Sequence, residues 1–85
     1  MQSFTYTIRA ELGIHARPAG LLMKEARKFS SNITLHVNGK SADVKKLIAL
    51  MSLAVRKGAD VTVSAEGADE AEAAARLKEF FEATF

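Results

Sequence analysis

The stretch Ile33–Asp43, which reads ITLHVNGKSAD, carries the clearest local fold signal in the chain. Its apolar residues alternate with polar ones as far as Val37, which is the period of a strand with one buried face. Asn38-Gly39 follows directly, and this pair favours a type I′ turn because both central residues of that turn need positive φ. The stretch therefore predicts a β-hairpin, with residues 40–43 as its short return strand.

Two further strand patterns and three helical patterns lie on either side of this hairpin. Strands are predicted where apolar residues occupy every second position, and helices where they recur at intervals of three and four residues. The strands lie at Phe4, Tyr6 and Ile8 and at Val61, Val63 and Ala65; the helices run from Ala16 to about Phe29, over Leu47–Leu53 with Gly58 marking the exit, and onward from Asp69 with Ala74, Leu77 and Phe81 as the buried stripe. Asp69 with Glu72 three residues later resembles a capping box.

The predicted order is strand, helix, strand, strand, helix, strand, helix, or βαββαβα. Helices gathered on one side of a sheet predict an α+β protein, here an open-faced two-layer sandwich with three helices on one face. The chain has 85 residues, so we expect a single domain over residues 1–85.

Composition excludes several classes of protein. The absence of cysteine rules out disulfides and thiolate metal sites, and it suits a cytoplasmic location. No apolar stretch reaches the roughly 20 residues that cross a bilayer, so no membrane insertion is expected. Twelve basic residues against ten acidic ones leave a net charge of +2, which does not by itself indicate nucleic acid.

The run Gly13-Ile14-His15-Ala16-Arg17-Pro18 indicates chemistry. It places a histidine just before a predicted helix, whose first N–H groups lack internal partners and carry a partial positive charge. Pro18 suits a first helical turn because its missing N–H would have no acceptor there. We expect the N–H groups of Ala16 and Arg17 to point toward the His15 ring. A neutral imidazole can attack phosphorus, and the helix terminus and the Arg17 guanidinium could then hold the dianion. A single histidine near a helix start is more often a cap or a surface residue.

The same run, with Asn38–Asp43, Met51–Leu53 and Ser64–Gly67, resembles the HPr family over essentially the whole chain. These are the histidine phosphocarriers of the bacterial phosphoenolpyruvate-dependent sugar phosphotransferase system. The resemblance implies an antiparallel sheet of strand order 1-4-2-3 and a monomeric relay without cofactor or metal, and not an enzyme. It also implies phosphoryl transfer from enzyme I to Nδ1 of His15, the pros nitrogen, and onward to the IIA component of a sugar permease.

A carrier must dock at least two partners, and the resemblance favours one surface for this. We expect it to combine residues of the first helix with apolar residues of the short second helix: Gly20, Leu21, Lys24, Arg27, Leu47, Ile48 and Met51. The alternative is that Leu47 and Met51 belong to the core and that the basic residues are merely solvated.

Three positions depart from the family pattern. Lys46 stands where many Gram-positive relatives have a regulatory serine, so no serine-kinase control is expected. Leu12 replaces a frequent polar residue near the phosphate region, and Ala54 replaces a frequent glycine, which we expect to be tolerated.

Other functions fit the sequence less well. An RNA-binding module shares the βαββαβ order, but it needs aromatic residues on its inner strands, and Phe4 and Tyr6 are better explained by packing. A metalloenzyme or hydrolase needs ligand spacing that His15 and His36 do not provide. A nitrogen-branch or regulatory HPr paralogue stays open.

Overall fold

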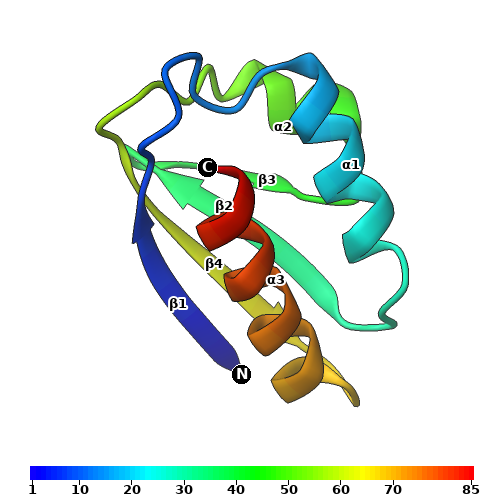
Figure 1. Ribbon diagram of the computed structural model, residues 1–85. Coiled ribbons are helices and arrows are strands. Elements are labelled where there is room, and N and C mark those ends of the chain that lie inside the picture. The colour runs from blue at the N-terminus through cyan, green and yellow to red at the C-terminus, as the bar shows by residue number, and fades with distance from the viewer.

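Four strands form one antiparallel sheet, and three helices lie on one face of it (Figure 1). The computed structural model describes residues 1–85. The elements are β1 (Gln2–Thr7), α1 (Ala16–Ala26), β2 (Asn32–Val37), β3 (Lys40–Asp43), α2 (Leu47–Ser52), β4 (Asp60–Glu66) and α3 (Glu70–Thr84). This is the predicted βαββαβα sandwich.

The sheet has the strand order β1-β4-β2-β3, as the family resemblance implied. Its hairpin pairs Val37 with Lys40, and the two turn residues, Asn38 and Gly39, have φ angles of 49° and 77°. Both values lie in the left-handed region that a type I′ turn requires. The hairpin prediction is therefore confirmed in its turn and in its return strand, Lys40–Asp43.

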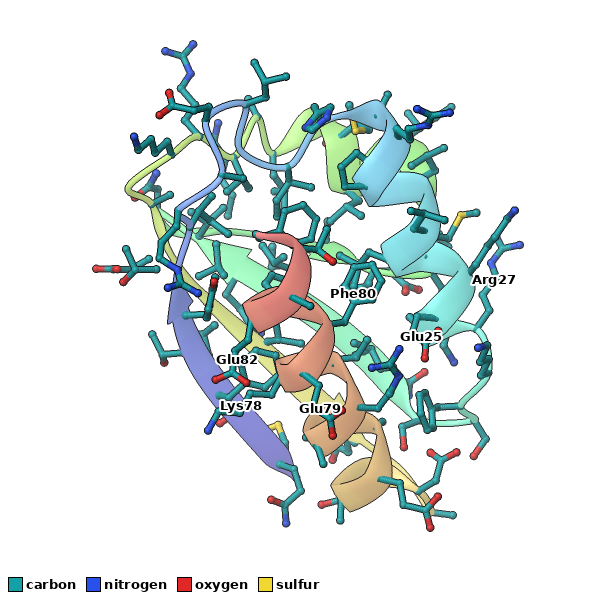
Figure 2. The ribbon with its side chains drawn as sticks, in the orientation of Figure 1. Glu25, Arg27, Lys78, Glu79, Phe80 and Glu82 are labelled. Atoms are coloured by element: carbon teal, nitrogen blue, oxygen red, sulfur yellow. The ribbon has the colours of Figure 1, made fainter.

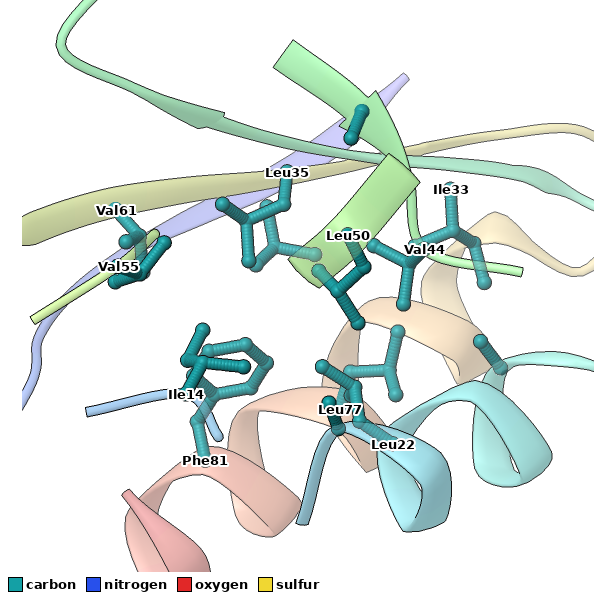
Figure 3. Close-up of a cluster of buried hydrophobic side chains, with 14 of the residues drawn as sticks. Ile14, Leu22, Ile33, Leu35, Val44, Leu50, Val55, Val61, Leu77 and Phe81 are labelled. Atoms are coloured by element: carbon teal, nitrogen blue, oxygen red, sulfur yellow. The ribbon is translucent and has the colours of Figure 1, made fainter. Parts of the chain in front are cut away.

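The core lies between the sheet and the helices (Figure 3). Alternate strand residues such as Leu35 and Val63 are buried against the helices, where they meet Leu22, Leu50 and Leu77. Fully buried Phe81 of α3 packs edge-on against two half-buried rings of β1, with ring centroids 5.7 Å from Phe4 and 5.8 Å from Tyr6. These two aromatic residues are thus packing residues, as expected.

Two helices end earlier than the sequence pattern predicts. α1 ends at Ala26 with Arg27 as its C-cap, and residues 27–28 form a turn. α2 ends at Ser52, and two residues later Ala54 takes a left-handed φ of 50°. Gly58 therefore does not mark the helix exit; it lies in the turn before β4 and donates its N–H to the Ile8 carbonyl.

The start of α3 also differs from the prediction. Asp69 is the N-cap residue, but its side chain does not cap the helix, so the capping box is wrong. Its carboxylate instead accepts hydrogen bonds from the backbone N–H groups of Ser30 and Ser31 and from the Ser31 hydroxyl. Glu70 accepts the N–H of Gly67. Asp69 thus joins the loop before β2 to the loop before α3.

These donors lower the pKa of Asp69, with the Ser31 hydroxyl as the largest cause and the Ser30 N–H next. A carboxyl group whose pKa is lowered by folding stabilises the fold above its ordinary pKa, and it loses this effect as pH falls through the lowered value. We expect Asp69→Asn to reduce the free energy of unfolding near neutral pH, because one carboxylate oxygen becomes an NH₂ group facing N–H donors. Urea unfolding of both proteins near pH 7 and near pH 2 should show the gap closing at acid pH. A gap of equal size at both pH values would contradict this.

Candidate functional site

His15 is the N-cap residue of α1. Its backbone is extended, with φ −108° and ψ 175°, and its carbonyl accepts the N–H of Ala19 at 2.9 Å. The N–H groups of Ala16 and Arg17 have no acceptor within the chain, and Pro18 has no N–H group. Two backbone donors with the positive end of the helix dipole therefore stand beside the residue that carries the imidazole.

The His15 ring is half-buried and makes no hydrogen bond to the first turn of the helix. Its Nδ1 lies 3.4 Å from the Gly13 carbonyl oxygen, a long contact for a hydrogen bond. The ring is thus available to a partner from outside without breaking a strong internal bond.

The loop before His15 is anchored by its backbone. Gly13 is buried with φ 63° and donates its N–H to the Ala10 carbonyl at 2.9 Å. The Ile14 side chain is 5% exposed, and its N–H donates to the Val55 carbonyl at 3.1 Å. This buried anchor gives the adjacent His15 a fixed starting point at the surface.

Arg17 is exposed two residues after His15, and its guanidinium forms no ion pair. An unpaired guanidinium is a strong ligand for a phosphoryl group because its N–H groups can donate in pairs to two oxygens. The chain therefore offers an imidazole, two free amide donors and a free cation within three consecutive residues.

Helices α1 and α2 lie next to each other on the same side of the sheet (Figure 1). Each exposes one large apolar residue: Leu21 is 52% exposed and Ile48 is 86% exposed. Leu47 and Met51 are half-buried and pack against the core, while part of each residue stays accessible to solvent. We call the surface formed by Gly20, Leu21, Lys24, Arg27, Leu47, Ile48 and Met51 the α1/α2 surface.

The α1/α2 surface has a basic border. Lys24 and Lys46 are exposed and form no ion pair. The one acidic residue of α1, Glu25, is held by Lys28 at 3.0 Å and by Arg76 of α3 at 2.6 Å, and these partners lower its pKa. Figure 2 shows Glu25 on the side of α1 that faces α3, away from Arg27. The free charge on this surface is therefore positive.

Arg27 has a structural contact that sequence reasoning missed. Its Nε and Nη2 atoms both donate to the Lys45 carbonyl, at 3.1 Å and 2.8 Å, and Lys45 Nζ donates to the Phe29 carbonyl at 2.7 Å. The two side chains thus tie the end of α1 to the segment before α2. No residue type signals this contact, because any residue can supply a backbone carbonyl.

His36 lies apart from this site. It is exposed on the open face of the sheet, where its Nε2 is 3.1 Å from the Ser64 hydroxyl.

None of the helices combines the length and the apolar character that a membrane span requires.

This βαββαβα sandwich is the fold of a solved histidine-containing phosphocarrier protein. The chain belongs to the HPr family of the phosphotransferase system, because the model of the family described as "PTS HPr component phosphorylation site" matches residues 2–83. As in that family, its general role is that of a phosphocarrier of the phosphotransferase system.

Solved structures of three similar proteins agree with this assignment. A Mycoplasma histidine-containing phosphocarrier protein is 38% identical over 98% of this chain and 94% of its own, with a TM-score of 0.95. HPr of Thermoanaerobacter tengcongensis is 41% identical over 98% and 93%, with a TM-score of 0.93. The Bacillus subtilis catabolite repression protein Crh, solved as a swapped dimer, is 40% identical over 92% and 90%, with a TM-score of 0.78.

Proposed function

We propose that His15 accepts a phosphoryl group from phosphorylated enzyme I and passes it to the IIA component of a sugar permease. The observation that carries this is the place of His15: a half-buried imidazole at the N-cap of α1, beside two amide donors without acceptors. Such donors bind anions, because they supply both hydrogen bonds and the positive end of the helix dipole.

The transfer step needs only the ring and its neighbours. The Nδ1 lone pair attacks the phosphorus, an N–P bond forms, and the bond from phosphorus to enzyme I breaks with its electron pair staying on enzyme I. The attacking nitrogen must be unprotonated, so Nε2 carries the ring proton. A lone pair on Nδ1 cannot face both the Gly13 carbonyl oxygen and the phosphorus, so the ring turns away from the carbonyl contact at 3.4 Å.

After transfer the phosphoryl group meets the donors already described. The N–H groups of Ala16 and Arg17 and the Arg17 guanidinium would face its oxygens, while Pro18 leaves no further donor in that turn. These contacts are charge-assisted and open to solvent on one side. An open site suits a relay, because the same phosphoryl group must reach a second protein.

The α1/α2 surface is the proposed contact for both partners. Exposed Leu21 and Ile48 offer apolar contacts, and the unpaired Lys24 and Lys46 favour partners with an acidic surface. We place the protein in the cytoplasm as a monomer.

The function is tested by incubating the protein with labelled phosphoenolpyruvate and catalytic enzyme I. One phosphoryl group per chain is expected, stable in base and labile in acid, and it should move to an added IIA component. Base-labile or acid-stable label would contradict a phosphohistidine. A dimer in sedimentation experiments would contradict the monomer.

A regulatory paralogue is the second candidate, because Crh of Bacillus subtilis is among the similar structures. Lys46 argues against regulation by a serine kinase. It is the exposed N-cap residue of α2 and has no hydroxyl group that could accept a phosphoryl group. The labelling experiment with enzyme I separates the phosphocarrier from the regulatory paralogue.

Replacing Gly20 tests the α1/α2 surface, because we expect the change to stabilise the fold and to weaken partner binding. It lies inside α1, and a Cβ there would meet nothing within 4 Å. Gly20→Ala is expected to raise the free energy of unfolding by about 0.5–1 kcal/mol, because glycine is a poor helix former. The added methyl group should also hold a partner away and raise the KM for phosphorylated enzyme I. Urea unfolding and labelling kinetics measure the two effects, and greater stability with an unchanged KM would place Gly20 outside the surface.

A further inference from the structure

The turn that leaves α2 contains a backbone conformation that alanine rarely adopts. Ala54 has φ 50°, and the only other non-glycine residue with positive φ is Asn38 in the hairpin turn. An L-residue is strained there because its Cβ approaches the following carbonyl. Such strain persists only where the surroundings hold it, and it concentrates at functional sites.

The next residue, Val55, connects this turn to the loop before His15. Its carbonyl accepts the Ile14 N–H at 3.1 Å, and both side chains are 5% exposed. Figure 3 shows the Val55 and Ile14 side chains among the buried apolar residues. The Gly13 backbone lies so close that a Cβ on it would overlap the Val55 carbonyl oxygen. Because His15 follows Ile14 directly, the Val55 carbonyl fixes the point from which His15 projects.

Other contacts hold the same two segments together. Ile8 donates its N–H to the Ala59 carbonyl at 2.9 Å, and Gly58 donates its N–H to the Ile8 carbonyl at 2.8 Å. Lys57 Nζ and Glu11 Oε1 form an exposed ion pair at 2.7 Å. The segment after α2 thus runs beside the loop that leads to His15. A change in the backbone direction of this segment is therefore transmitted to His15.

We propose that Ala54 is a positioning residue for His15. Its left-handed backbone turns the chain so that the Val55 carbonyl meets the Ile14 N–H. The functional part of the inference rests on the proposed function, because it takes His15 as the phosphoryl acceptor. The same turn follows α2, which contributes Met51 to the α1/α2 surface. It therefore connects the proposed docking surface to the His15 loop.

The test compares Ala54→Val with Asn38→Val. Both variants put a β-branched residue, for which positive φ is strongly unfavourable, at an exposed left-handed position. Only residue 54 lies next to Val55, whose carbonyl accepts the Ile14 N–H. In Ala54→Val, hydrogen exchange of the Ile14 amide is expected to accelerate about threefold or more, because the left-handed turn is disfavoured and local opening becomes easier. The NMR signals of the His15 ring should shift, and the labelling rate at saturating phosphorylated enzyme I should fall with KM unchanged. Asn38→Val changes the distant hairpin turn and should leave all of these at wild-type values.

The exchange and NMR measurements need no phosphate, so they test the positioning separately from the proposed function. Wild-type Ile14 exchange and His15 signals in Ala54→Val would overturn the proposal. A raised KM with an unchanged saturated rate would also overturn it, because the effect would then be on docking. Faster Ile14 exchange in a protein that enzyme I never labels would support the backbone coupling and refute the proposed function.

Discussion

His15→Ala is expected to lower phosphoryl acceptance from enzyme I at least about 1,000-fold, because the nucleophile itself is removed. No other side chain near the helix terminus can take its place, since Arg17 cannot be deprotonated and Ala16 and Pro18 carry no nucleophile. The fold should survive, because the ring is half-buried and its one internal polar contact is the long one to the Gly13 carbonyl. The stoichiometry of acid-labile label and the melting temperature measure the two expectations.

His36→Ala is the matched control, because it removes the only other imidazole in the chain. That ring lies on the open face of the sheet against the Ser64 hydroxyl, so its loss should leave labelling unchanged. Label that persists in His15→Ala and disappears in His36→Ala would move the acceptor to the other face of the molecule. Label retained in both single variants would contradict His15 as the one acceptor.

Local signals made most of the fold predictable. The alternation over residues 33–37 and the Asn38-Gly39 pair both act within a few residues, so the hairpin and its register follow from them. His15 with Pro18 likewise marks a helix start at Ala16. The strand order followed only from the family resemblance, because alternation shows which face of a strand is buried and not which strand lies beside it.

The predictions were wrong where a side chain forms hydrogen bonds with residues distant in the sequence and not with its neighbours. Asp69 has the residue type of a helix cap, but Ser30 and Ser31 offer it three donors from another loop. The apolar spacing that predicts α1 as far as Phe29 contains no sign of the Lys45 carbonyl, to which Arg27 donates beyond the helix end. Ala54 shows the same limit, since alanine is the best helix former and nothing nearby in the sequence predicts a left-handed turn.

Gly13→Ala is expected to destabilise the fold by about 3–5 kcal/mol, which is a large share of the stability of a small domain. The residue has φ 63°, so any Cβ is strained there. That Cβ would also overlap the Val55 carbonyl oxygen and stand 2.8 Å from Arg56 Cα, and backbone atoms cannot yield as a flexible side chain does. The Ile14–Val55 hydrogen bond would be pushed apart, and the melting temperature should fall by about 15 °C or more.

Gly39→Ala separates the two causes of this loss. Gly39 also has a left-handed φ, of 77°, but a Cβ there would meet nothing within 4 Å. Its replacement should cost only the backbone strain, about 1–2 kcal/mol. The difference between the variants in urea unfolding then measures the overlap with the Val55 carbonyl alone. Equal losses would mean that the loop before His15 moves aside freely, and the buried anchor of the phosphoryl acceptor would then not exist.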